Sequence, residues 1–211
     1  MRPVVAKKKA RIAVLISGGG SNLQAILDAA ANGSLSHGEV VLVVSSRDSA
    51  YGLERARLAG IPTAVIRSRD FASTADFDNA LSKVIDDHQA DLIVLAGYMS
   101  ILSEGFVKRY PQRIVNIHPS LIPAFSGEGF YGLRVHEAAL SAGVKVSGAT
   151  VHYVNEVCDG GEILEQQTVR VFPDDSPQDL QQRVLTQVEH VIYPRVIEQL
   201  AKEIVGNSHD S

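Results

Sequence analysis

Residues 11–30 read RIAVLISGGGSNLQAILDAA, and this stretch decides the fold of the chain. A run that is apolar on successive residues, Ile12–Ile16, suits a strand buried on both faces of a parallel sheet. Three glycines follow, and then apolar residues recur at helical spacing at positions 23, 26, 27 and 30, with Ser21 placed as the N-cap. The stretch therefore predicts a strand, a tight glycine turn and an amphipathic helix.

The same alternation continues along the chain. Further runs rich in Val and Ile lie at 40–44, 63–66, 92–96 and 114–117, and a helical pattern at 77–85 precedes the third of them. After a long loop at 119–132 we expect a short helix at about 135–142, extended segments at 146–154 and 163–172, and a helix from Pro177 to about 204. This order predicts an α/β fold with a doubly wound, mostly parallel sheet, a mixed C-terminal part and a closing C-terminal helix.

Composition limits the class of protein. The 211 residues predict a single domain over 1–211, with flexible tails at 1–10 and 205–211. A net charge of −4 argues against a general nucleic-acid binder, and one cysteine excludes an internal disulfide scaffold. The lysines at 7–9 are followed by too few apolar residues for a signal peptide or a membrane span. We therefore expect a cytoplasmic protein with neither a nucleic acid nor a membrane as its partner.

The glycine turn, Ser17–Asn22, is a candidate anion site. Glycines let the backbone approach a ligand, and the free N–H groups at a helix start favour negative charge, above all a phosphate. The turn is not a P-loop, because no Gly-Lys-Ser/Thr follows, and Leu23 stands where a dinucleotide fingerprint has its third glycine. The alternative is a tight turn that binds nothing.

Polar side chains leave the fifth strand at the same edge of the sheet. Strand alternation puts Asn116 and His118 on one side, where an amide and an imidazole can stabilise an oxyanion and move protons. A carboxylate follows later, in Cys158-Asp159-Gly160-Gly161. If Asp159 faces His118, it raises the imidazole pKa and orients the ring. The alternatives are a hydrogen-bonded histidine at a strand end and an aspartate that only shapes a turn.

Metal and thiol chemistry have less support. His136-Glu137 begins like a zinc-protease helix, but Leu140 stands where the second histidine is needed. No cysteine-hydrolase signature surrounds Cys158. We expect no catalytic metal and no nucleophilic cysteine.

Together these motifs resemble those of the phosphoribosylglycinamide formyltransferases, the folate-dependent formyltransferases of purine biosynthesis. The resemblance runs from about residue 11 to residue 204. It is carried, in order and spacing, by Ile16–Gln24, Leu95–Met99, Asn116–Leu121 and Asp159–Gly161. The Asn-x-His-Pro-Ser-Leu element is shared by the wider formyltransferase family, and the glycine turn with Ser-Asn points to this branch.

The resemblance implies a Rossmann-like formyltransferase fold and assigns roles to residues. The substrates it implies are glycinamide ribonucleotide and 10-formyltetrahydrofolate, the latter as co-substrate and without a metal. It implies substrate binding by Gly20, Ser21, Asn22 and Glu189, pteridine binding by Met99, Ser100, Ile101, Leu102, Asn116 and Asp159, and catalysis by Asn116, His118 and Asp159. The chain is expected to be a monomer or a homodimer.

Two departures from the family pattern bear on folate binding. Many members have an arginine where this chain has Ser100, and some have one near Thr74, so contacts to the folate tail stay open. The glycine-rich loop at 125–132 is either a mobile lid or a tolerated surface insertion.

Several other functions compete with this interpretation. Methionyl-tRNA formyltransferase and formyltetrahydrofolate hydrolase are similar around Asn116–Leu121 but carry extra domains, for which 211 residues leave no room. A non-catalytic nucleotide-binding module would explain the glycine turn but not the polar trio. A methyltransferase is disfavoured by the glycine spacing.

Overall fold

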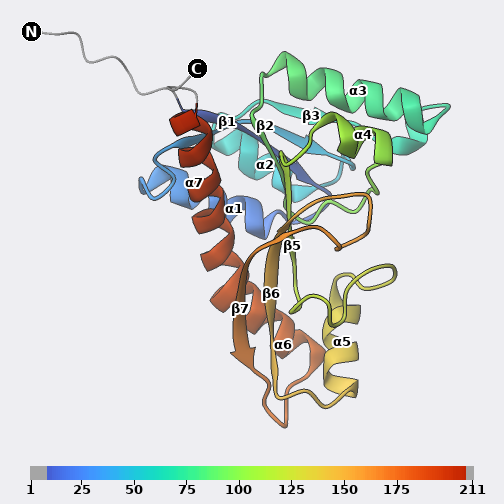
Figure 1. Cartoon of the computed structure of the whole chain (residues 1–211), viewed down its shortest axis with the longest axis vertical. Helices are drawn as coiled ribbons and strands as arrows, with labels where there is room; N and C mark the ends of the chain where they lie inside the picture. The colour runs from blue at the N-terminus through green and yellow to red at the C-terminus, as the bar shows by residue number, and fades with distance from the viewer. Residues whose placement is uncertain (1–8, 208–211) are drawn as a thin grey trace, which may run out of the picture.

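The computed structural model describes residues 9–207, which form a seven-stranded sheet in the order β3-β2-β1-β4-β5-β6-β7 (Figure 1). Strands β1 to β5 pair in parallel, whereas β6 and β7 are added antiparallel. The predicted doubly wound sheet with a mixed C-terminal part is confirmed. The strands are β1 (Ala10–Ile16), β2 (Gly38–Ser45), β3 (Thr63–Val65), β4 (Leu92–Leu95), β5 (Ile114–His118), β6 (Val146–Tyr153) and β7 (Ile163–Arg170).

Two apolar cores form because successive side chains of a strand point to opposite faces of the sheet. In β1, the side chains of Ile12, Val14 and Ile16 belong to one core, and those at 13 and 15 belong to the other. The first core is covered by α1 (Ser21–Ala31) and α7 (His190–Asn207), and the second by α3 (Thr74–Asp87) and α4 (Glu104–Arg109) (Figure 1). Burial on both faces explains why the strands read as continuous apolar runs.

Two helices were not expected from the sequence. They are α2 (Tyr51–Leu58) and α4, and a short 3-10 turn, Ser68–Asp70, precedes α3. Helix α2 has eight residues and buries only Gly52 and Ala56, so it carries no repeat of large apolar side chains. Short helices of this kind are stabilised by packing in the folded chain, which a sequence pattern does not show.

The C-terminal region contains α5 (Leu133–Ser141) and α6 (Pro177–Val184), whose N-cap Ser176 forms a capping box with Asp179. The predicted long helix to about 204 is present, but it is not one regular α-helix. A π-helical turn, Leu185–Glu189, separates α6 from α7. Pro194 lacks the N–H that would bond to the carbonyl of residue 190, and the wider turn ends just before that point.

Part of each predicted flexible tail belongs to a strand or helix in the structure. Ala10 is the first residue of β1, and residues 205–207 belong to α7. The remainder of both tails, including Lys7 and Lys8, lies outside the described residues. Among residues 9–207, no helix is long and apolar enough to span a membrane.

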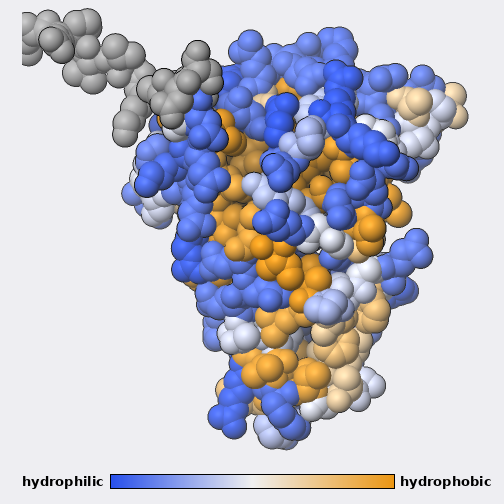
Figure 2. All heavy atoms as spheres, in the orientation of Figure 1, coloured by the Kyte–Doolittle hydropathy of each residue, from blue (hydrophilic) through white to orange (hydrophobic). Residues whose placement is uncertain are grey.

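Polar and apolar side chains are unevenly spread on the face shown in Figure 2. Hydrophilic residues cover its top and its flanks, while hydrophobic residues gather in a band through the centre toward the lower end (Figure 2). Exposed apolar side chains include Val146, which opens β6, and Phe172, which follows β7.

Candidate active site

The candidate site lies where the carboxyl ends of β1, β4 and β5 meet. The chain passes from β1 to β2 on one side, while β4 pairs with β1 on the other side. Ligands of open α/β sheets bind at such a reversal of strand order. The glycine turn follows β1 and the segment 96–103 follows β4, and the N–H of Met99 donates to the Ser17 hydroxyl oxygen at 2.8 Å. The structure thus joins two of the predicted binding segments.

The glycine turn ends at Gly20, which has φ of +70° and is the N-cap of α1. The prediction of Ser21 as the N-cap was wrong, because the left-handed backbone of Gly20 turns the chain one residue earlier and no side chain caps the helix. The first N–H groups of a helix have no acceptor within it. Here they belong to Ser21, Asn22 and Leu23, and together with the positive end of the helix dipole they form a site for an anion.

Close packing makes Gly20 sensitive to substitution. A Cβ atom at this position would lie 2.8 Å from the Cα of Gly52, on a backbone conformation that side chains disfavour. We expect Gly20→Ala to lower the free energy of unfolding by about 1–3 kcal/mol in urea titrations. Gly18→Ala is the matched control, because a Cβ there meets nothing within 4 Å. Equal stability of the two variants would contradict the structural role of Gly20.

A buried polar pair links the start of α1, directly after the glycine turn, to the π-helical turn before α7. The amide nitrogen of Asn22 donates to a carboxylate oxygen of Glu189 at 2.7 Å, and both residues are buried. Burial raises the pKa of Glu189, against the smaller lowering effect of the Asn22 bond. The amide oxygen of Asn22 has no partner among residues 9–207. Two predicted substrate-binding residues, 167 positions apart in the chain, are therefore bonded to each other beside the glycine turn.

The structure brings His118 and Asp159 together. The Nδ1 atom of His118 lies 3.4 Å from Oδ2 of Asp159, and both side chains are at most 9% exposed. The other ring nitrogen, Nε2, lies 2.9 Å from the carbonyl oxygen of Phe125, and because a carbonyl only accepts, Nε2 carries the hydrogen. The N–H of Gly127 donates to Oδ2 of Asp159 at 2.9 Å. The glycine-rich loop at 125–132 therefore contacts both members of the pair.

His152 is a site residue that the sequence analysis missed. It lies directly opposite Asn116 in the antiparallel β5–β6 pair, and its Nε2 is 3.2 Å from the Asn116 amide nitrogen. Its Nδ1 lies 2.8 Å from the Tyr153 carbonyl oxygen, and because a carbonyl only accepts, Nδ1 carries a hydrogen. The same Nε2 is 3.6 Å from Oδ1 of Asp159. The alternation of apolar residues over 146–154 predicts which face of the strand residue 152 lies on. Only the register of the β5–β6 pair shows that it lies opposite Asn116.

Burial and charge set the protonation of the pair. Burial is the largest effect on His118 and places its pKa below the ordinary 6.5, although the Phe125 bond and the Asp159 charge act to raise it. The predicted raising effect of Asp159 is therefore present but outweighed. For Asp159, burial acts to raise the pKa, but His152, the Gly127 N–H and the His118 charge together lower it below 3.8. At neutral pH the site holds an ionised Asp159 beside a neutral His118.

The segment predicted to bind pteridine lies beside the glycine turn, to which the Met99–Ser17 bond joins it. The side chains of Met99 and Ile101 are 48% and 89% exposed, whereas Ser100 and Leu102 are half-buried. Exposed apolar side chains of this kind offer a surface to a flat ring system. Thr74, the other position that departs from the family pattern, is the first residue of α3.

The remaining candidates are placed as follows. Cys158 is an exposed free thiol whose pKa is raised, first by burial and then by Asp159, so the reactive thiolate is disfavoured. His136 is buried, and burial lowers its pKa to about 4, with a further contribution from His118. Within residues 9–207, no group of three His, Cys, Asp or Glu side chains could hold a metal ion.

Comparison with known proteins gives consistent matches. Residues 10–197 match the family model described as formyl transferase. The phosphoribosylglycinamide formyltransferase of Escherichia coli strain K12 is 47% identical over 186 residues, which cover 88% of this chain and 84% of that protein. The structure is similar to that of glycinamide ribonucleotide transformylase 1 from Symbiobacterium toebii, with a TM-score of 0.86, 44% identity and coverage of 92% and 89%.

Some similar proteins are much longer. A trifunctional purine biosynthetic protein of Drosophila melanogaster is 44% identical over 198 residues, which cover 93% of this chain but 14% of that protein. The chain thus spans a small part of the trifunctional relatives and most of the bacterial ones.

Proposed function

The chain belongs to the formyl transferase family, and we propose that it is a folate-dependent phosphoribosylglycinamide formyltransferase whose residues perform the reaction as follows. The enzyme transfers the formyl group of 10-formyltetrahydrofolate to the primary amine of glycinamide ribonucleotide. The products are formylglycinamide ribonucleotide and tetrahydrofolate, in de novo purine biosynthesis. The observation that carries the assignment is the meeting of an anion-binding glycine turn with the Asn116, His118 and Asp159 set at one edge of the sheet.

In this proposal, the ribonucleotide is held at both ends of its sugar phosphate. The N–H groups at Gly20, Ser21 and Asn22 bind the phosphate, because they lie at the positive end of α1. The Glu189 carboxyl, which the Asn22 amide holds in place, accepts hydrogen bonds from ribose hydroxyls. These contacts fix the substrate so that its amine points along the sheet edge toward His118.

The folate lies on the other side of the site. Its pteridine is bound by the segment Met99, Ser100, Ile101 and Leu102. Asp159 and the Asn116 amide contact the polar end of the folate. Holding two substrates in line converts an encounter in solution into a reaction within one complex, which accounts for a large part of the acceleration.

The chemical step starts when the amine nitrogen bonds to the formyl carbon and the carbonyl electron pair moves onto its oxygen. The Asn116 amide donates to this oxyanion, and its orientation is held by the acceptor nitrogen of His152. The proton lost by the amine passes through water to Nδ1 of His118, where Asp159 stabilises the imidazolium. As the C–N10 bond breaks, that proton goes to the folate nitrogen.

For Nε2–H of His118 to reach the oxyanion, the Phe125 carbonyl has to be exchanged for the formyl oxygen. The loop at 125–132 therefore moves with the reaction, which favours a role as a lid over a surface insertion. Because His118 is neutral beforehand, its positive charge develops only as the oxyanion forms. Stabilisation that appears in the transition state and not in the ground state is what raises turnover.

The pH dependence follows from these protonation states. A His118 that is already protonated cannot accept the proton from the amine, and its pKa in the free enzyme lies below 6.5. We expect kcat/KM for the folate, with ribonucleotide saturating, to be level between about pH 7 and pH 8 and to fall on the acid side of 6.5. An acid limb that is unchanged in His118→Ala would remove His118 from proton transfer.

The function is tested by following the absorbance of a 10-formyl folate with and without glycinamide ribonucleotide. We expect release of the folate only when the amine is present. Release without the amine would indicate a hydrolase, and no release under either condition would indicate a binding module. We further propose that the enzyme acts in the cytoplasm, as a monomer or homodimer, and without a metal ion.

A further inference from the structure

Helix α2 packs against the glycine turn and donates hydrogen bonds to its backbone. The N–H of Gly52, in the first turn of α2, donates to the carbonyl oxygen of Gly18 at 3.0 Å. One turn later, Nε of Arg55 donates to the carbonyl oxygen of Gly19 at 2.8 Å. Two successive carbonyl groups of the turn are therefore bonded to the same short helix.

These bonds determine where the N–H groups of the turn point. In a planar trans peptide, the C=O and the N–H point in opposite directions. Because the carbonyls of Gly18 and Gly19 face α2, the N–H groups of Gly19 and Gly20 face away from it, toward the open side of the turn. Helix α2 thus fixes two backbone donors in the orientation that an anion requires.

The contact between α2 and the turn leaves no room for side chains. A Cβ on Gly20 would lie 2.8 Å from the Cα of Gly52, and a Cβ on Gly52 would lie 2.5 Å from a methyl carbon of Ile16. Backbone therefore packs against backbone. A guanidinium on the next turn of α2 can then reach a carbonyl of the glycine turn.

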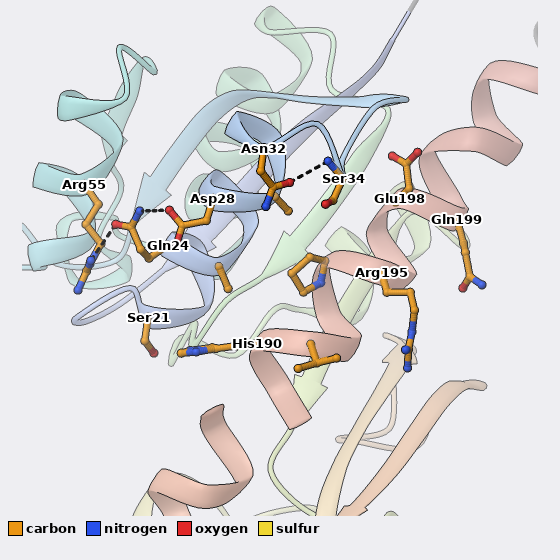
Figure 3. Close-up of a pocket in the computed structure, with 14 residues that line it drawn as sticks. Ser21, Gln24, Asp28, Asn32, Ser34, Arg55, His190, Arg195, Glu198 and Gln199 are labelled. Atoms are coloured by element: carbon orange, nitrogen blue, oxygen red, sulfur yellow. Dashed lines mark hydrogen bonds between the residues drawn. The ribbon is translucent and has the colours of Figure 1, made fainter. Parts of the chain in front are cut away.

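The guanidinium of Arg55 is held on further sides. Its Nη1 donates to the Gln24 side-chain oxygen at 2.8 Å, and Gln24 in turn donates to Asp28 at 2.8 Å (Figure 3). The guanidinium carbon lies 5.0 Å from the centre of the Tyr51 ring. Together with Arg55, the side chains of Gln24 and Asp28 line one end of a surface groove of about 650 Å³ that also contains Ser21 and His190 (Figure 3). A fixed positive charge therefore lies directly behind the proposed phosphate site.

We propose that Arg55 is a positioning residue for the phosphate of the substrate. It holds the Gly19–Gly20 peptide with its N–H outward and polarises that peptide through a charge-assisted bond to its carbonyl. The positive charge also favours a phosphate monoester over an uncharged sugar. The proposal rests on the proposed function in one respect only, namely that the glycine turn binds the phosphate.

The test compares Arg55→Met with Arg57→Met in the full chain. Arg57 lies on the same helix, is exposed, and pairs through its side chain with its neighbour Glu54, which makes it the matched control. Binding of ribose 5-phosphate is measured by titration calorimetry, without folate or amine. We expect Arg55→Met to weaken binding by about 10- to 100-fold, which is the loss of one charge-assisted hydrogen bond. Arg57→Met should bind like the unmodified chain.

Kinetics and spectroscopy separate positioning from general stability. In Arg55→Met, KM for glycinamide ribonucleotide should rise in parallel with the weaker binding, while kcat and KM for the folate stay within about twofold. Arg55→Lys, which retains the charge, should recover part of the loss. The amide resonance of Gly20 should shift in Arg55→Met and not in Arg57→Met, because only the first loses the bond to the carbonyl of that peptide.

Three outcomes would overturn the proposal. The first is unchanged binding of ribose 5-phosphate in Arg55→Met, and the second is an equal loss of binding in Arg57→Met. The third is a general loss of activity in Arg55→Met, with a lower kcat and a higher KM for both substrates, that is explained by a lower melting temperature alone. If the Met variant does not fold, Arg55→Lys decides the question by the same binding measurement. A chain that binds ribose 5-phosphate but transfers no formyl group contradicts the proposed function and leaves this proposal standing. A chain that does not bind it contradicts the proposal.

Discussion

Replacing Asp159 by asparagine is expected to lower kcat by about 10²- to 10⁴-fold, the range over which a positioned acid or base acts. The carboxylate is the negative charge that faces both His118, at 3.4 Å, and His152, at 3.6 Å. Asparagine keeps the size of the side chain but removes the charge that stabilises an imidazolium in this buried site. The effect should therefore appear in kcat, measured with both substrates saturating.

The matched control for this variant is Asp174→Asn, because Asp174 is exposed in the loop before α6. It should retain kcat within about twofold, since surface substitutions rarely change a site. The Gly127 N–H that bonds to Asp159 can still bond to an amide oxygen, so Asp159→Asn should fold. Turnover near that of the unmodified enzyme in a folded Asp159→Asn would show that no imidazolium forms beside residue 159.

His118→Ala is expected to lower kcat by about 10²- to 10³-fold or more, the loss seen when one oxyanion donor is removed. The variant removes both the acceptor of the amine proton and the Nε2–H that the Phe125 carbonyl holds in this structure. It should also abolish the fall of kcat/KM at acid pH, because the group that titrates is gone. Single-turnover measurements with saturating substrates separate this loss from any change in product release.

The control is His88→Ala. His88 is the C-cap of α3, which precedes β4, so it lies at the opposite edge of the sheet from the site. Its Nδ1 bonds to the carbonyl oxygen of Val84 in its own helix. It should retain kcat within about twofold, because it is far from both substrates. A folded His118→Ala that turns over as fast as His88→Ala would exclude His118 from the chemical step.

Much of the fold could be predicted from local patterns. The apolar run at Ile12–Ile16 and the glycine turn after it specify a buried strand and a helix start within a few residues of each other. The Ser176-Pro177 start of α6 is equally local, because its capping box uses only backbone and side chains of one turn. Helix α2 and the π-helical turn at 185–189 have no such local signal, and the sequence analysis did not find them.

In the candidate site, too, some positions follow from local patterns and others depend on tertiary contacts. Asn116 and His118 share one strand, so alternation alone places them on one side. The partner of each depends on a different strand or loop. His152 reaches Asn116 through the β5–β6 register, and Asp159 reaches His118 through a loop that folds back over the end of β6.

By itself, the sequence determined which residue types stand at the strand ends and that a doubly wound sheet would gather them at one edge. Such conclusions rest on interactions between near neighbours, whose geometry is set by φ, ψ and side-chain period. Only the tertiary structure decided that His118 is neutral beside an ionised Asp159, because burial depends on everything packed around a group. It also decided that Arg55 braces the glycine turn, since residues far apart in the chain meet only after the sheet has formed.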